Sequence, residues 1–268
     1  MDLSTPKVMG ILNVTPDSFF SSSRYMSEEG ILRRVDQMIE DGADIIDVGA
    51  CSTKPGIEVV QEDEELLRLK LALHLIRKRW PDIPVSVDTF RSRISSFVVN
   101  EYGVDIINDI SGGDMDPDMF KTVAELNVPY ILMHMKGSSP ATMQKNPQYG
   151  DMMQEIISYF AERVQKLREL GVNDIILDPG FGFGKTIDNN FELLRRLPDF
   201  HFFNLPILVG ISRKSMIYKL MNITPEQSLN GTSVLNALAL MGGAHILRVH
   251  DVKEAKECVQ LVQTFKTA

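Results

Sequence analysis

Eight short apolar runs alternate with longer amphipathic stretches, and this alternation constrains the fold more than any other feature of the chain. Strands that alternate with helices pair in parallel, with the helices outside the sheet. The expected strands are Val8–Asn13, Ile45–Gly49, Val85–Asp88, Ile106–Asp109, Tyr130–His134, Ile175–Asp178, Ile207–Ser212 and Ile246–His250. Eight such repeats favour closure, so we predict an α/β fold: a (β/α)8 TIM barrel in which residues 1–268 form a single domain.

The expected helices follow the strands, and their apolar residues recur at spacings of three and four residues. They are Ser27–Asp41, Gln61–Arg79, Arg91–Glu101, Asp116–Leu126, Asp151–Leu170, Asn189–Arg196, Ser215–Leu220, Ser228–Met241 and Val252–Phe265. An open doubly wound sheet is the alternative, but no G-x-G-x-x-G turn follows the first expected strand. The 268 residues also match the roughly 250 that are typical of one barrel.

Composition and charge exclude several classes of protein. A formal net charge of −8 opposes non-specific binding to nucleic acid or to a membrane surface, because both need a basic surface. No apolar stretch is long enough to cross a bilayer and the N-terminus lacks an export pattern, so we expect a cytoplasmic protein. Cys51 and Cys258 form no metal-ligand pattern and predict neither a disulfide framework nor structural zinc.

Polar side chains stand where the expected strands end, and in a barrel these ends meet at the face that carries the active site. Asp88, Asn108 and Asp178 suit a flat nitrogen heterocycle, because a carboxylate can accept two parallel hydrogen bonds from an amino-pyrimidine edge. The alternative for each carboxylate is a cap on the following helix. The other polar strand ends are Asn13, Asp109, His134, Ser212, Arg248 and His250.

Basic residues after the last two strands predict an anion site. Arg213 and Lys214 lead straight into an expected helix, and the last strand adds Arg248 and His250. Barrels often hold a phosphate at this place, where the N–H groups of a helix terminus assist. Asn13 together with a phosphate oxygen could hold Mg²⁺ weakly. No histidine has metal-ligand spacing, so His134 is expected to be a hydrogen-bonded barrel residue.

Three loops attract attention. The glycine-rich stretch 180–186 lacks the G-x-x-x-x-G-K-[ST] frame of a phosphate loop, because Pro179 stands where the first glycine should be. Its Phe181 and Phe183 could form a stacking wall or could pack in the core. The loops at about 15–25 and 136–150 follow strands and are long enough to close over a substrate.

Seven motifs, in order along the chain, resemble the dihydropteroate synthase family. They are Met9–Phe19, Asp47–Gly49 with Ser52–Gly56, Asn108–Gly113, Met133–Gly137, Asp178–Lys185, Gly210–Ser215 and Arg248–Asp251. The resemblance implies one pterin-binding barrel and a transferase of folate biosynthesis. Such an enzyme condenses (7,8-dihydropterin-6-yl)methyl diphosphate with 4-aminobenzoate to give 7,8-dihydropteroate and diphosphate. The resemblance also implies a Mg²⁺ cofactor and a homodimer built on barrel helices, which Leu235, Leu238 and Leu240 would permit.

The resemblance further implies roles for individual residues. The pterin would lie against Asp88, Asn108, Met133, Asp178, Phe183, Gly210, Lys214 and Arg248. The diphosphate and 4-aminobenzoate would lie against Asn13, Phe19, Thr53, Lys54, Pro55, Ser212, Arg248 and His250, with Mg²⁺ on Asn13. Catalysis would fall to Asp88, Lys214, Arg248 and His250. In this family the diphosphate leaves first, and the arylamine then attacks a stabilised pterin cation.

Two departures from the family pattern keep alternatives open. Ser21-Ser22-Ser23 stands where the family commonly has Asp-Gly-Gly, and Lys54 replaces an arginine and so loses its bidentate fork. The first departure leaves room for a catalytically impaired pterin-binding homologue. A methyltetrahydrofolate:corrinoid methyltransferase would share the pterin-binding acidic and amide residues, but it would have no use for basic residues that hold diphosphate.

Overall fold

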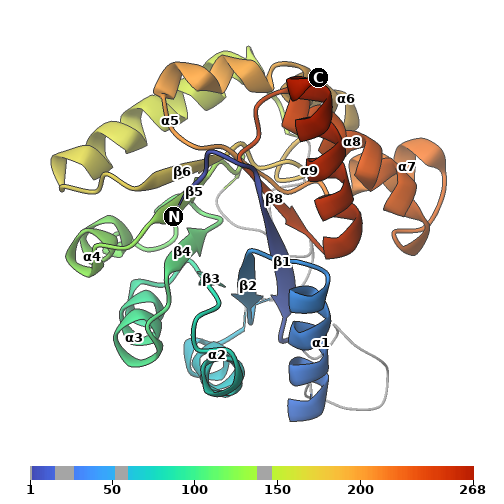
Figure 1. Cartoon of the computed structure of the whole chain (residues 1–268). Helices are drawn as coiled ribbons and strands as arrows, with labels where there is room; N and C mark the ends of the chain where they lie inside the picture. Colours follow the sequence, from blue (N-terminus) through green and yellow to red (C-terminus); the bar gives the residue numbers. More distant parts are fainter. Residues whose placement is uncertain (1, 16–26, 52–59, 138–146) are drawn as a thin grey trace.

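The computed structural model describes residues 2–15, 27–51, 60–137 and 147–268, and these residues form the predicted barrel (Figure 1). The strands pair in parallel in one sheet with the order β6-β5-β4-β3-β2-β1-β8-β7. They are β1 Lys7–Asn13, β2 Ile45–Gly49, β3 Val85–Asp88, β4 Ile106–Asp109, β5 Tyr130–Met133, β6 Ile175–Asp178, β7 Leu208–Val209 and β8 Ile246–Val249. Apart from β7, the strand ends agree with the prediction to within one residue.

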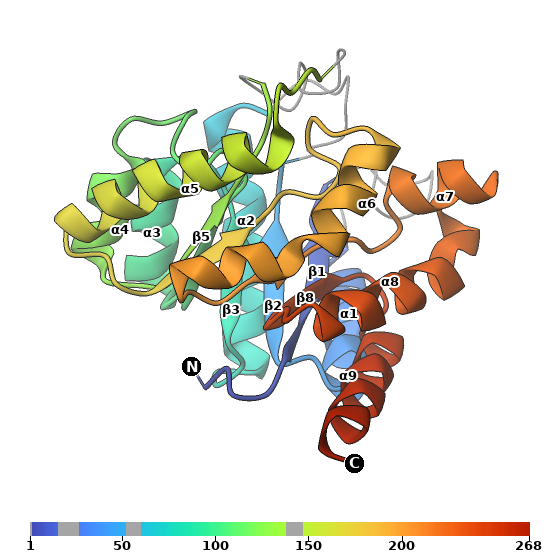
Figure 2. The same cartoon turned by 90° about the horizontal axis from the view of Figure 1, so that it is seen from above.

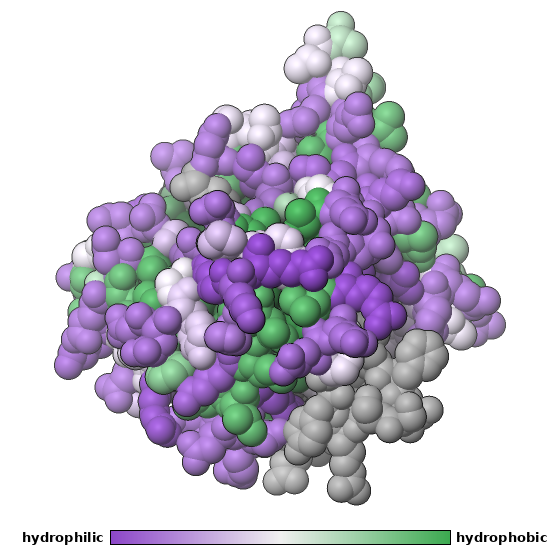
Figure 3. Space-filling view, turned by 60° about the horizontal axis from the view of Figure 1, so that its bottom comes forward, coloured by the Kyte–Doolittle hydropathy of each residue, from purple (hydrophilic) through white to green (hydrophobic). Residues whose placement is uncertain are grey.

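Helices surround the sheet on its outer side (Figures 1 and 2). They are α1 Glu28–Glu40, α2 Glu62–Arg79, α3 Ser92–Tyr102, α4 Met119–Leu126, α5 Met152–Glu169, α6 Ile187–Arg195, α7 Ser215–Met221, α8 Leu229–Met241 and α9 Val252–Thr267. The sequence pattern does not anticipate the short 3₁₀ helices η1 (Leu197–Phe203) and η2 (Glu226–Ser228). No helix within the described ranges is long and apolar enough to cross a membrane. On the face shown in Figure 3, hydrophobic side chains gather near the centre and hydrophilic side chains cover most of the remainder.

Helix α4 begins later than the sequence predicts. The Asp116 carboxylate accepts hydrogen bonds from the backbone N–H groups of Ser92 (2.7 Å) and Asp118 (3.0 Å). This side chain therefore holds a turn ahead of the helix, which begins at Met119. The predicted start at Asp116 is wrong for this reason.

Strand β7 is shorter than the predicted range Ile207–Ser212, because its ladder covers only Leu208–Val209. The backbone then leaves the sheet. The N–H of Lys214 closes a turn on the carbonyl of Ile211 (3.1 Å), and Arg213 takes a left-handed conformation with a φ of 54°. The turn into α7 thus replaces the last part of the predicted strand.

The barrel is nearly closed by contacts between β6 and the two residues that precede β7. Ile207 forms an isolated parallel bridge with Leu177. The N–H of Leu177 also donates to the carbonyl of Pro206 (2.8 Å). These contacts bring the first and last strands of the sheet order together.

An apolar layer fills the barrel toward the amino ends of the strands. Successive side chains on a strand alternate between the barrel interior and the helix layer. The interior layer consists of Met9, Ile45, Ile106, Ile131, Ile176, Leu208 and Ile246, all of them buried. Two residues further along three of these strands stand Asp47, Asn108 and Asp178, which are also buried. The apolar layer is therefore a floor on which the polar site is built.

Candidate active site

A half-buried arginine joins two carboxylates near the carboxyl ends of the strands. The Nε of Arg248 on β8 donates to Oδ2 of Asp47 on β2 (2.7 Å), and its Nη2 donates to Oδ2 of Asp88 on β3 (2.7 Å). Charges removed from water in this way persist because they are paired and hydrogen-bonded. The structure thus brings together Asp88 and Arg248, two of the residues that the sequence assigns to the site.

The same pairing controls the charge of these groups. Burial raises the pKa of Asp88 to about 7, an effect that Arg248 opposes and Asp47 reinforces. Burial also disfavours the charge of Arg248, but the attraction of Asp47 and Asp88 outweighs it and raises the pKa of Arg248 above its ordinary value. Asp88 can therefore exchange a proton near neutral pH, while the arginine stays charged.

Asp47 belongs to this cluster, although sequence reasoning does not single it out as a site residue. The Nδ2 of Asn108 lies 3.4 Å from Oδ1 of Asp47 and 3.3 Å from its Oδ2. Asp47 stands inside an apolar run rather than at its end, so the search for polar strand ends misses it. Its signal is a charged residue at an interior-facing position of a buried strand, where only a paired carboxylate is tolerated.

Asn13 borders the same cluster at the end of β1. A Cβ atom added to Gly49 would lie 3.5 Å from Oδ1 of Asn13 and 3.8 Å from Oδ2 of Asp88, so both oxygens face the space that this glycine leaves. Amide and carboxylate oxygens suit Mg²⁺. Within the described part of the chain, no group of three or more His, Cys, Asp or Glu side chains could hold a metal ion by itself. A cation beside Asn13 would therefore need further oxygens from a bound ligand.

Asp178 and Lys214 form a second polar group at the ends of β6 and β7. Oδ1 of Asp178 accepts from the N–H of Gly180 (2.8 Å), and Nζ of Lys214 donates to the carbonyl of Phe181 (2.5 Å). Burial raises the pKa of Asp178, and Lys214 opposes this shift. Burial lowers the pKa of Lys214 to about 8, against the attraction of Asp178. An acceptor and a donor of moderated charge thus lie beside each other in a buried setting.

Apolar side chains and one glycine shape the space between the polar groups. Met133 and Phe183 pack in a cluster with Phe90, Ile110 and Met135. Nζ of Lys214 lies 4.6 Å from the centroid of the Phe183 ring. A Cβ atom on Gly210 would lie 3.8 Å from Nζ of Lys214 and 3.8 Å from Cβ of Arg248, so the glycine leaves room between the two cations. An apolar wall beside polar edges suits a flat, polar-edged ring.

Ser212 and His250 form a hydrogen-bonded pair. Oγ of Ser212 lies 3.0 Å from Nδ1 of His250 and accepts from the backbone N–H of His250 (3.1 Å). Nη2 of Arg34 on α1 donates to the His250 carbonyl (2.5 Å). Burial and the neighbouring Arg248 lower the pKa of His250 to about 4. At neutral pH this imidazole is therefore a hydrogen-bonding group rather than the cation that the sequence suggests.

Arg213 does not join the predicted anion site. Its Nε and Nη2 donate to Asp251 (2.9 and 2.7 Å), and its Nη1 lies 3.4 Å from the Pro225 carbonyl and 3.2 Å from that of Glu226. These contacts occupy its guanidinium. The prediction that it would bind an anion is wrong because the left-handed turn at this residue directs the side chain to α9 and η2.

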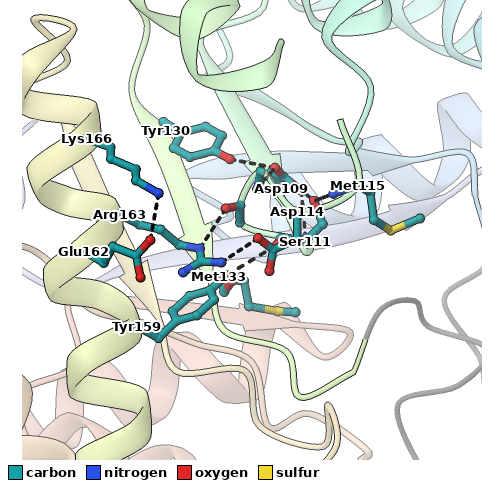
Figure 4. A network of polar contacts seen from close by, with 12 residues as sticks. Asp109, Ser111, Asp114, Met115, Tyr130, Met133, Tyr159, Glu162, Arg163 and Lys166 are labelled. Atoms are coloured by element: carbon teal, nitrogen blue, oxygen red, sulfur yellow. Dashed lines mark hydrogen bonds and ion pairs between the residues drawn. The ribbon is translucent and has the colours of Figure 1, made fainter. Parts of the chain in front are cut away.

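Asp109 also lies outside the cluster, although it ends a strand. It follows Asn108 directly and so occupies the helix-facing side of β4. Its oxygens accept hydrogen bonds from the Tyr130 hydroxyl (2.6 Å), from Ser111 and from the backbone N–H of Gly113 (Figure 4). Asp109 thus fixes the loop that follows β4.

His134 is a buried, hydrogen-bonded barrel residue, as predicted, and its Nδ1 lies 3.0 Å from Nζ of Lys185.

Helix α5 braces the same loop from outside the barrel (Figure 4). The Tyr159 hydroxyl donates to the carbonyl of Met133 (2.9 Å) and lies 3.3 Å from that of Ser111. Arg163 pairs with Asp114 (2.5 Å), and its guanidinium lies 3.6 Å from the centroid of the Tyr159 ring. Sequence reasoning misses this network, because α5 reads only as an amphipathic helix.

Four of the predicted site residues, namely Phe19, Thr53, Lys54 and Pro55, lie outside the described residues. Both long loops fall mainly in the same ranges, as do the serines at 21–23. The other predicted site residues lie at the strand ends or in the loops that follow them, as described above.

The chain is similar to known proteins over most of its length. The family model described as pterin binding enzyme matches residues 9–250. The chain is 44% identical over 270 residues to dihydropteroate synthase from Escherichia coli K12, covering 100% of this chain and 94% of that protein. It is 40% identical over 257 residues to dihydropteroate synthase from Bacillus subtilis, covering 95% of this chain and 87% of the relative.

Solved structures of similar proteins also share this fold. Dihydropteroate synthase from Yersinia pestis with a sulfonamide drug has a TM-score of 0.93 and 40% identity, covering 100% of this chain and 96% of that one. The enzyme from Xanthomonas albilineans with 4-aminobenzoic acid has a TM-score of 0.91 and 34% identity, covering 99% and 95% of the two chains.

Proposed function

Because the chain belongs to the pterin-binding enzyme family, as a dihydropteroate synthase, we propose that its barrel holds the pterin, the diphosphate and the arylamine at the residues described above. The enzyme is a transferase of folate biosynthesis. The family match spans most of the chain, which supports one pterin-binding barrel domain over residues 1–268. The observation that carries the placement is the hydrogen-bonded cluster of Arg248, Asp47 and Asp88, with Lys214 on the other side of Gly210 from Arg248.

The pterin would lie on the apolar floor with its polar edge toward carboxylates and amide. Asp178 and Asn108 offer acceptors and a donor to the amino-pyrimidine edge, and Met133 and Phe183 offer an apolar wall. Lys214 would donate to a ring acceptor. Arg248 would stack on the ring while it reaches toward the diphosphate.

Catalysis would be electrostatic, because no side-chain nucleophile is required. The bond between the pterin methylene carbon and the diphosphate oxygen breaks, and the oxygen keeps the electron pair. The nitrogen of 4-aminobenzoate then bonds to the methylene carbon and loses a proton. Ionised Asp88 stabilises the positive charge that develops on the ring, and Arg248 stabilises the departing diphosphate. His250 would donate a hydrogen bond to the same anion.

The remaining placements concern the metal and the arylamine. Asn13 and the diphosphate oxygens would hold Mg²⁺, whose charge would help to neutralise the leaving group. Ser212 would border the 4-aminobenzoate together with Phe19, Thr53, Lys54 and Pro55. Relatives that were solved with 4-aminobenzoic acid and with a sulfonamide drug support an arylamine site in this fold.

The deciding experiment is diphosphate release from the purified protein given the pterin diphosphate and Mg²⁺, with and without 4-aminobenzoate. We expect release that depends on the arylamine, yields dihydropteroate and falls when a chelator removes Mg²⁺. Pterin binding without release would instead support the impaired homologue or the methyltransferase.

We also propose a homodimer that uses α8. The structure corrects part of the expectation, because Leu235 and Leu240 are buried in the core. Leu238 is 52% exposed, and Val234 and Met241 on the same helix are 52% and 48% exposed. Contiguous exposed apolar side chains on a helix support an interface.

A further inference from the structure

Lys185 is buried behind the loop that carries Phe181 and Phe183, and the proposed function leaves it without a role. Its Nζ donates to the carbonyls of Gly180 (2.9 Å) and Phe183 (3.2 Å) and lies 3.0 Å from Nδ1 of His134. The residue is only 8% exposed. An ammonium group so far removed from water is retained where several acceptors compensate for its lost hydration.

Burial and the neighbouring charges set the protonation states of Lys185 and His134. The pKa of His134 lies well below its ordinary value because of burial and the nearby Lys185, so the imidazole is neutral and can accept at Nδ1. Burial lowers the pKa of Lys185 to about 7, while Asp178 opposes the shift and Lys214 adds to it. The ammonium therefore has a fixed set of partners on the end of β5 and on the glycine-rich loop.

The loop that Lys185 holds is in contact with residues of the site. Gly180 has a φ of +72°, and a Cβ atom there would lie 1.8 Å from the His134 carbonyl oxygen. A Cβ atom on Gly182 would lie 3.1 Å from Cδ of Lys214. The Phe181 carbonyl accepts from Nζ of Lys214. The position of this loop therefore sets the position of the Lys214 ammonium.

We infer that Lys185 is a positioning residue for the pterin site: its ammonium ties the loop 180–184 to the end of β5, and the loop fixes Lys214 and the Phe183 ring. This inference rests on the proposed placement of Lys214 and Phe183 against the pterin. It assigns Lys185 no contact with substrate, and its effect on the reaction passes entirely through the loop.

The first test is Lys185→Met, which removes the ammonium and keeps an unbranched stem. We expect the KM for the pterin diphosphate to rise at least tenfold, while the KM for 4-aminobenzoate stays within twofold of the wild-type value. The matched control is Lys166→Met, which removes an exposed lysine on α5 whose partner is Glu162. A variant that loses thermal stability but keeps both KM values would overturn the inference, because Lys185 would then serve stability alone.

The second test is a double-mutant cycle with Lys214→Met. If Lys185 acts through the loop that fixes Lys214 and Phe183, the pterin KM of the double variant should rise by clearly less than the product of the two single effects. Independent, multiplying effects would overturn the inference and leave the site assignment intact. An unchanged pterin KM in Lys214→Met would instead defeat the proposed placement of Lys214.

A third pair of variants keeps Lys185 itself intact, in case its replacement prevents folding. His134→Asn retains an acceptor for Nζ of Lys185, whereas His134→Leu removes it. We expect the pterin KM to stay near the wild-type value in the asparagine variant and to rise severalfold in the leucine variant. Equal pterin KM values in the two folded variants would contradict a positioning role for this contact.

Discussion

Arg248 lies between two carboxylates, so the residue that would stabilise the leaving group also neutralises the residue that would stabilise the cation. A positively charged ring that develops beside Asp88 adds a second cation to this cluster. It favours the ionised form of Asp88, whose pKa burial raises to about 7. In the proposed reaction, the cation that forms would therefore stabilise the ionised form of Asp88 on which its own stabilisation depends.

The turnover rate should rise with pH through about 7, because in the proposed mechanism the ionised form of Asp88, whose pKa lies at about 7, would stabilise the cation. Asp88→Asn should remove this acid limb of the kcat profile and lower kcat about 100-fold or more. The stability effect has the opposite sign: a carboxyl whose folded-state pKa is raised contributes most below its ordinary value of 3.8, and this contribution is lost as pH approaches 7.

Steady-state assays of both proteins from pH 5.5 to 9 measure the limb, an interval chosen to bracket the pKa of about 7. Asp174→Asn, which changes an exposed carboxyl, is the control and should keep the wild-type profile. An acid limb that persists unchanged in Asp88→Asn would show that another group titrates.

At the scale of single residues, position at a strand end identified Asp88, Asn108 and Asp178, because the ends of parallel strands must converge in a barrel. The same rule could not find Asp47, which lies within its strand. It also misjudged Arg213, since adjacency to Lys214 in the sequence says nothing about a left-handed φ that separates their side chains.

At the scale of elements, the site depends on a helix that does not reach it. Helix α5 fixes the loop after β4 and the end of β5 through Tyr159 and Arg163 (Figure 4). Asn108 and Met133 stand at those strand ends. A helix outside the barrel thereby helps to position two residues that we propose bind the pterin.

Tyr159→Phe should destabilise the protein by about 1–3 kcal/mol, because it removes the hydroxyl that satisfies the Met133 carbonyl. The KM for the pterin diphosphate should also rise severalfold, since Met133 loses its outside support. Urea unfolding and steady-state kinetics measure the two effects. Lys166→Met on the same helix breaks only an exposed ion pair and should change stability by less than about 1 kcal/mol. A Tyr159→Phe variant indistinguishable from this control would refute the bracing role.

Alternating strand and helix patterns predict the elements of this fold well, because burial on both faces makes parallel strands continuous apolar runs. The misjudged boundaries arise where side chains redirect the backbone. Asp116 holds a turn before α4, and the turn at Arg213 ends the run that would otherwise extend β7. Such local hydrogen bonds and torsions leave no periodic trace in a sequence.

At the scale of the whole molecule, α8 presents apolar side chains that a partner would cover. Leu238→Glu should shift the protein from dimer to monomer, because a charge at the centre of an apolar interface is costly to bury. Light scattering after gel filtration measures the mass. Leu67→Glu on α2 is the control, since Leu67 is 60% exposed on a different helix. A wild-type protein that is already monomeric would reject the dimer proposal.

The number of backbone pairings between neighbouring strands differs around the barrel. Adjacent strands in the sheet order share ladders of two to five residue pairs, whereas among the described residues a single bridge, Leu177 to Ile207, joins the two edge strands. We therefore expect the barrel to deform most easily between β6 and β7, next to Asp178 and Lys214. We therefore expect a bound bicyclic ring to widen the barrel at this bridge before it disturbs the ladders beneath Arg248, Asp47 and Asp88.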